Sequence, residues 1–263
     1  MTASARLCGL LAVAVVAQRR CDLPTTIPPS AAHCGELDIA GGEATGSTLA
    51  FQLLSGVIVL AANATAAART VRKRHKEPLA KYVDARCVAL TYRDPRDVVC
   101  SHARRRGVPG DSGDCAHCSA AALEARVLGV TKRLFPFHAG RLDAFEGAGA
   151  LSLKYESFVD CPEALASLFA AWLGVAERLP PGYASSLAAA SSLAANSKRA
   201  AALGVFGRHD PATQIHGRHI SQGGRTNAWE ADCLTPTALR RVEGAIGRPW
   251  LERRGYAPAT TAR

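Results

Sequence analysis

VALTYRDPRDVVCS, residues 88–101, is the stretch that decides the fold of this chain. Its first five residues are mostly apolar or β-branched and predict a short buried strand. The pattern breaks at Arg93, and a helix is expected next, with Asp97 in its first turn and Ser101 further along. Ligands of open α/β sheets bind at the carboxyl ends of strands, where this pattern puts Arg93. A guanidinium there suits a phosphate because its planar fork donates two hydrogen bonds at once, although a surface turn with an Arg–Asp ion pair fits the same residues.

A glycine-rich loop, GGEATGST at residues 41–48, is a second indication of anion binding. It lies between a predicted strand, Leu37–Ala40, and a predicted apolar helix of about Ser47–Leu60. Such a loop exposes backbone N–H groups and a helix N-terminus, which together cradle phosphate. The glycines have the spacing of a Walker loop, but Ser47 stands where that motif has Lys, which argues against an ATPase or a kinase.

Strands and helices alternate along the rest of the chain. We expect a helix at Ser119–Phe137, a strand at Leu151–Tyr155 and helices at Pro162–Leu173 and Ala184–Leu203. This order predicts an α/β fold of three layers, in which a parallel sheet is flanked by helices. The 263 residues suit one such domain at 36–257, with a linker at 18–35 before it and a tail at 258–263 after it.

The Arg93 stretch resembles the segment with which sulfotransferases hold the ribose phosphate of their sulfuryl donor, phosphoadenosine phosphosulfate (PAPS). There too an Arg ends the strand and a Ser follows eight residues later, as Ser101 does here. Gly46-Ser47-Thr48 matches the Gly-Ser/Thr-Thr of that family's phosphate loop. Lys73-Arg74-His75 resembles the family's Lys-x-His segment.

Two later segments follow in the family's order. Leu151–Glu156 resembles a strand that ends in Tyr-Glu, and Gly223–Trp229 resembles the glycine-rich loop before a Trp that encloses the donor. Each segment is a weak signal alone, but five in one order cover most of the chain. The chain is therefore identified as a member of the sulfotransferase superfamily, whose three-layer fold is like that of P-loop nucleotide hydrolases.

The resemblance implies an enzyme that moves a sulfuryl group from PAPS to a hydroxyl, without a metal ion. His75 is the implied base, because histidine ordinarily titrates near the working pH, and Lys73 would stabilise the transferring group. The implied donor-binding residues are Gly46, Ser47, Thr48, Arg93, Ser101, Tyr155 and Arg225. From the residues alone, a solvated charge run around Lys73 and a core aromatic at Tyr155 are the competing interpretations.

Two positions depart from the family. Ala44 replaces the basic residue that normally stands two positions before the glycine of Gly-Ser/Thr-Thr, and Glu230 replaces a Lys that often follows the Trp. A second interpretation is therefore a catalytically impaired protein of the same fold that binds PAPS or an anionic glycan. A small-molecule kinase is a third, which a preference for ATP with magnesium would distinguish.

The net charge of +10 favours an anionic ligand, and both PAPS and many glycans are anionic. Lys and Arg are spread over several segments and aromatic residues make up only 6% of the chain, so nucleic acid is not expected as a partner. The expected partners are PAPS and a hydroxyl-bearing acceptor.

The N-terminus and the cysteines bear on the compartment. Residues 1–17 contain an apolar run that is short for a membrane span and fits the hydrophobic region of a signal peptide; an alanine-rich helix packed on the domain is the alternative. Asn63-Ala64-Thr65 is a glycosylation acceptor by sequence, and nine cysteines suit an oxidising compartment. The spacing of Cys115 and Cys118 fits a loop disulfide or plain thiols better than a metal site.

These features predict the secretory pathway, in the Golgi lumen, with membrane association only through the N-terminal segment. A carbohydrate acceptor is then favoured. A cytoplasmic chain would instead favour a small alcohol or phenol.

Overall fold

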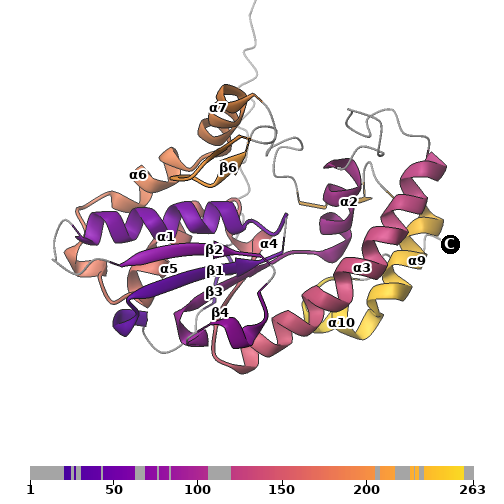
Figure 1. Ribbon diagram of the computed structural model, residues 1–263, viewed down its shortest axis with the longest axis horizontal. Helices are drawn as coiled ribbons and strands as arrows, with labels where there is room; N and C mark the ends of the chain where they lie inside the picture. Colours follow the sequence, from indigo (N-terminus) through magenta and orange to yellow (C-terminus); the bar gives the residue numbers. More distant parts are fainter. Residues whose placement is uncertain are drawn as a thin grey trace, which may run out of the picture.

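The computed structural model describes residues 21–24, 27, 31–42, 44–62, 69–75, 77–82, 84–105, 120–204, 208–216, 226–227, 229–230 and 234–257. Its main sheet has four parallel strands in the order β2-β1-β3-β4. The strands are β1 (Glu36–Gly41), β2 (Thr70–Arg74), β3 (Val88–Tyr92) and β4 (Leu151–Lys154). The expected α/β class with a parallel sheet flanked by helices is confirmed (Figure 1).

Helices connect the strands and continue beyond the last one. They are α1 (Ser47–Ala62), α2 (Pro95–Arg105), α3 (Ala120–Gly147), α4 (Tyr155–Phe158), α5 (Pro162–Trp172), α6 (Tyr183–Ala190), α7 (Leu193–Leu203), α9 (Pro236–Ile246) and α10 (Arg248–Arg253). Short 3₁₀ turns are η1 (Ala31–His33), η2 (Leu79–Lys81), η3 (Ala85–Cys87) and η5 (Ala176–Arg178), and a small hairpin pairs β5 (His209–Asp210) with β6 (Ile215–His216). No helix in the described part of the chain is both long and apolar enough to cross a membrane.

The sheet buries both of its faces, as the period of two in a strand requires. Leu37 and Ile39 of β1 pack with the apolar residues of α1 and α5 on one face. Ala40 packs with Leu90 and with Phe145 of α3 on the other face. Burial on both faces explains why β3 is a largely apolar run rather than an alternating one. In β1 the buried Asp38 is the exception, and it pairs with Arg72 and Arg74 of β2.

The strand order changes direction between β1 and β3. The chain leaves β1, returns as β2 on one side of it, and then crosses to form β3 on the other side. In open α/β sheets the crevice outside the carboxyl ends at such a point is where ligands bind. The loop after Gly41 and the residue after Tyr92, which is Arg93, therefore flank this position.

Three boundaries differ from the sequence prediction. The helix expected to end at Phe137 continues to Gly147 with Pro136 inside it, since Leu142 and Phe145 beyond the proline are held in the core. The segment 184–203 forms two helices rather than one, because the side chain of Ser192 caps α7 by accepting a hydrogen bond from Ala195 N. β4 ends one residue early, so that Tyr155 is the first residue of α4.

Two disulfides have both of their cysteines among the described residues. Cys21 is bonded to Cys161, and Cys34 to Cys87. These bonds fit the oxidising compartment that the cysteine content predicts. The glycosylation triplet at 63–65 and both Cys115 and Cys118 lie outside the described residues.

Candidate functional site

The loop between β1 and α1 is held in a tight, strained form. Thr45 Oγ1 donates to Gly42 O at 2.7 Å and lies 2.9 Å from Thr91 Oγ1 of β3. Gly46 has a φ of +83°, and a Cβ there would lie 2.4 Å from the ring of Tyr155, so this position requires glycine. Ala44 also has a positive φ, +66°, which is uncommon for a residue with a side chain.

The start of α1 meets the end of β2 at Lys73. Ser47 and Thr48 are buried in the first turn of the helix. Lys73 Nζ donates to Thr48 Oγ1 at 2.6 Å, which sets its ammonium beside the helix N-terminus. This contact makes the Lys-x-His segment and the glycine loop neighbours in space. The positive charge of Lys73 and the unpaired backbone N–H groups at the start of a helix both attract anions.

His75 follows directly after β2 and is half-buried. Its Nδ1 lies 2.9 Å from the carbonyl oxygen of Gly41. A carbonyl only accepts, so Nδ1 carries the hydrogen and the neutral ring has its acceptor at Nε2. This tautomer is the one in which Nε2 is able to take a proton from a bound group.

Arg93 links the loop to the helix after β3. Its Nη1 donates to Ala44 O at 3.3 Å, and its Nη2 donates to Asp97 Oδ2 at 3.1 Å. The guanidinium carbon lies 4.6 Å from the centre of the Tyr155 ring, a cation–π distance. The Arg93 side chain is only 9% exposed, so the cation is shielded from solvent on most sides.

Asp97 is the buried acid of this end of the site. Besides Arg93 it accepts backbone hydrogen bonds from Asn227 N at 2.9 Å and Trp229 N at 3.1 Å. Burial raises the pKa of Asp97 above its ordinary value, an effect that the charge of Arg93 opposes. The late segment around Trp229 is therefore attached to the Arg93 helix through one carboxylate.

A second ion network supports the same turn. Arg96 pairs with Asp94 at 2.7 Å and with Glu243 at 2.6 Å, and its guanidinium stacks 3.9 Å from the ring of Trp229. Glu156, the acid of the Tyr-Glu pair, accepts from Asp94 N at 2.8 Å, and burial raises its pKa. These contacts fix the backbone on either side of Arg93, which explains how one arginine is presented at the strand end.

A cavity opens at the carboxyl edge of the sheet, beside these groups. Its polar wall contains Gly41, Thr45, Arg93 and Arg141. Thr91 and Tyr92 of β3 also line the cavity. Most of the remaining wall is apolar and includes Leu90, Val98, Val99, Phe135, Leu142 and Trp250.

Arg141 is the site residue that the sequence analysis missed. It is buried on α3, where Nη2 donates to Tyr82 Oη at 2.7 Å and Nη1 donates to the carbonyl oxygen of His75. Its guanidinium also lies 5.2 Å from the ring centre of Phe145. Nothing in the local sequence distinguishes this arginine from the other charged residues of a long helix, so only the fold identifies it.

The remaining predicted residues have different outcomes. Ser101 is buried on α2, but no described hydrogen bond joins it to the loop or to Arg93. Tyr155 lies against both Gly46 and Arg93. Arg225 lies outside the described residues.

No protein-family model matches this chain, and no curated protein matches it significantly. The site therefore has to be interpreted from its own geometry. That geometry combines a glycine loop, two cations and a histidine at the carboxyl edge of a parallel sheet, which is suited to holding phosphate or sulfate groups and accepting a proton.

Proposed function

We propose that this chain is a PAPS-dependent sulfotransferase with a P-loop-like sulfotransferase fold, which transfers a sulfuryl group to a hydroxyl acceptor. One observation carries the proposal. The glycine loop at 41–48, the segment at 73–75 and Arg93, which resemble the family's donor-binding motifs, are linked in space by side-chain contacts: Lys73 to Thr48, His75 to Gly41 and Arg93 to Ala44. Those contacts join three separate strand–loop units at the position where open α/β sheets bind ligands.

The donor would lie across the switch point. The N–H groups of the glycine loop and of the first turn of α1, with Lys73, would hold the phosphosulfate end. Arg93 would hold the ribose phosphate, with Ser101 and Arg225 as further contacts, and Tyr155 would lie beside the adenine. Glycine at position 46 lets the loop pack directly against the rings of Tyr155 and Phe158, which would hold its N–H groups in place for the donor.

The chemistry would be a single in-line displacement. His75 Nε2 accepts the proton of the acceptor hydroxyl while the hydroxyl oxygen bonds to sulfur. The bond between sulfur and the donor's phosphate oxygen breaks, and phosphoadenosine phosphate leaves. Lys73 stabilises the negative charge that moves onto the leaving oxygen.

The acceptor is proposed to be a carbohydrate hydroxyl, in keeping with a secretory, Golgi-type location and the disulfides. The apolar wall of the cavity, with Phe135 and Trp250, favours a small apolar alcohol or phenol as the second choice.

A catalytically impaired binding protein is the second candidate function. Two observations favour it: Ala44 brings no charge to the glycine loop, and Arg93 is already paired with a buried carboxylate. Such a protein would bind PAPS or an anionic glycan without turnover.

The test is transfer from PAPS carrying a radioactive sulfuryl group to a panel of oligosaccharides and phenols, without magnesium. We expect label on at least one acceptor, and no transfer above background with His75→Ala. Donor binding without transfer to any panel member would favour the impaired protein. Absence of both donor binding and transfer would overturn the proposal.

A further inference from the structure

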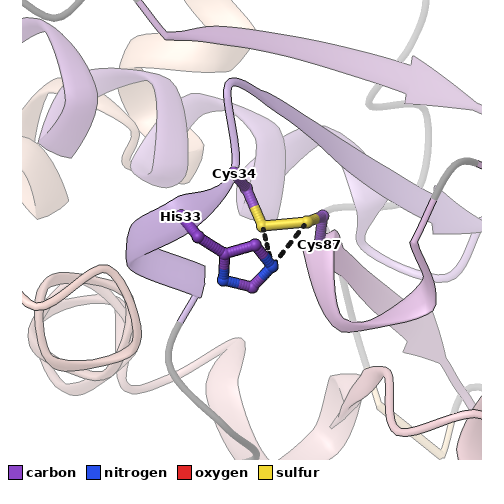
Figure 2. Close-up of side chains that lie close together, drawn as sticks. All are labelled: His33, Cys34 and Cys87. Carbon is purple, nitrogen blue, oxygen red and sulfur yellow. Dashed lines mark hydrogen bonds between the residues drawn. A yellow bond between two sulfur atoms is a disulfide. The ribbon is translucent and has the colours of Figure 1, made fainter.

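A second cluster of reactive side chains lies at the opposite, amino edge of the sheet. Cys34 precedes β1 and Cys87 precedes β3, and their disulfide joins the two central strands there. His33, in η1, turns its ring toward this bond, as Figure 2 shows. Its Nε2 lies 3.6 Å from Cys34 Sγ and 3.8 Å from Cys87 Sγ.

The spacing of these three atoms matches a zinc ligand set. A tetrahedral Zn²⁺ with bonds of about 2.3 Å to sulfur and about 2.0 Å to nitrogen holds nitrogen and sulfur ligands about 3.5 Å apart. The two distances from Nε2 lie close to that value, and all three ligand atoms lie within 4.8 Å of one another. Only the two sulfurs, which are now bonded to each other, would have to separate, to about 3.8 Å.

One acidic side chain lies beside the cluster, and the cluster is partly exposed. The carboxylate of Asp84 lies 3.3 Å from the same Nε2, and it is shared with Arg86. The side chain of His33 is 51% exposed and Cys87 is partly exposed, so the cluster is reachable by a reductant and by a metal ion. Within the described part of the chain, His33, Cys34 and Cys87 form a group of three ligand-type side chains close enough to share one metal ion.

We propose that His33, Cys34 and Cys87 form a redox-gated zinc site. A thiol or phosphine reductant supplies two electrons, and the disulfide takes them up with two protons to give two thiols while the reductant is oxidised. Zn²⁺ then displaces both thiol protons and binds two thiolates and His33 Nε2, with a water molecule as the fourth ligand. In the reverse step a small-molecule disulfide takes up two electrons and two protons to become two thiols, while the two thiolates re-form the Cys34–Cys87 bond and release Zn²⁺. The proposal is independent of the sulfotransferase assignment.

The test uses the full chain carrying Cys115→Ser and Cys118→Ser, which removes the other cysteine pair with metal-like spacing. The chain is reduced with a phosphine under anaerobic conditions and titrated with Co²⁺, followed by competition with Zn²⁺. We expect one equivalent of Co²⁺ with a thiolate charge-transfer band in the reduced chain, and no band in the oxidised chain.

Three further variants assign the ligands. Cys34→Ser should abolish the band, and His33→Ala should weaken Co²⁺ binding more than about tenfold. The matched control is Cys21→Ser with Cys161→Ser, which should leave binding unchanged. Loss of the far-ultraviolet helix signal on reduction, absence of the band, or a band indifferent to both Cys34→Ser and His33→Ala would overturn the proposal.

Discussion

The two ends of the candidate site differ in the groups that they offer to an anion. The glycine-loop end relies on backbone N–H groups and on Lys73, and its own strained position 44 carries an alanine. The Arg93 end has a strong cation, but a buried carboxylate, Asp97, already accepts from it. The glycine-loop end therefore has no charged side chain at position 44, and at the other end the charge of Arg93 is already paired with Asp97. Donor affinity should depend on how far Arg93 can turn from its internal acid to an external phosphate.

Removing the cation of Arg93 should have the largest effect, because it changes both the stability of the chain and its binding of the ligand. In Arg93→Ala the fully buried Asp97 is left without its cation, which should cost about 3–5 kcal/mol of unfolding free energy and abolish binding of phosphoadenosine phosphate. Denaturant unfolding and calorimetry measure the two effects. The control is Arg93→Ala with Asp97→Asn, which should recover stability but not binding. Recovery of binding in that double variant would contradict the role of Arg93.

Truncating the histidine separates chemistry from binding. His75→Ala should lower the transfer rate by about 10²–10⁴-fold, because the hydroxyl proton loses its acceptor. Binding of phosphoadenosine phosphate should change less than threefold, as roughly expected when the lost group serves the acceptor. His33→Ala, the same change at the opposite edge of the sheet, should leave transfer by the oxidised chain unchanged. Equal losses in both variants would argue that neither histidine is the base.

Adding a cation at position 44 should give the glycine-loop end a charged side chain, as the Arg93 end already has. Ala44→Lys should tighten binding of phosphoadenosine phosphate by about tenfold, since one charge-assisted contact contributes about 1–2 kcal/mol. The new side chain adds no backbone strain, because Ala44 already has a φ of +66°. Ala44→Gly is the matched control and should raise stability by about 1 kcal/mol without raising affinity. A lysine variant that binds no better than the glycine variant would contradict this view of the loop.

The smallest expected effect is the pH dependence of stability that comes from Asp97. The folded-state pKa of Asp97 is raised, so its contribution to stability is fully present below the ordinary value of 3.8 and is lost as the pH rises through the folded pKa. Unfolding free energies of the wild type and of Asp97→Asn, measured from pH 3.5 upward in about half-unit steps, should converge or cross in favour of the variant. A difference that stays constant with pH would mean that Asp97 keeps its ordinary pKa in the folded chain.

The strands β1, β3 and β4 were predictable because each is a short, largely apolar run bounded by polar or glycine residues. Arg93 was correctly expected at a strand end for the same reason. Both features depend on local pattern together with one topological rule. The strand β2 and the contact from its Lys73 to Thr48 were not predicted, because three of the five residues of β2 are basic.

Other parts of the site depend on distant packing and were not predictable. Arg141 reaches the cavity only because α3 continues past Pro136, which local propensity would not suggest. The attachment of Asp97 to the Trp229 segment joins residues far apart in sequence. Disulfide pairing among nine cysteines cannot be deduced from spacing, so the position of His33 beside one bond had no sequence signal.

The central claim is that the glycine loop, Lys73 and Arg93 form one donor site. It is tested most directly by calorimetric titration of the wild-type chain with phosphoadenosine phosphate in the absence of magnesium, with ATP as the comparison ligand. The account predicts binding of one equivalent of phosphoadenosine phosphate, which Arg93→Ala abolishes, and much weaker binding of ATP. Absence of binding, or a preference for ATP with magnesium, would contradict it.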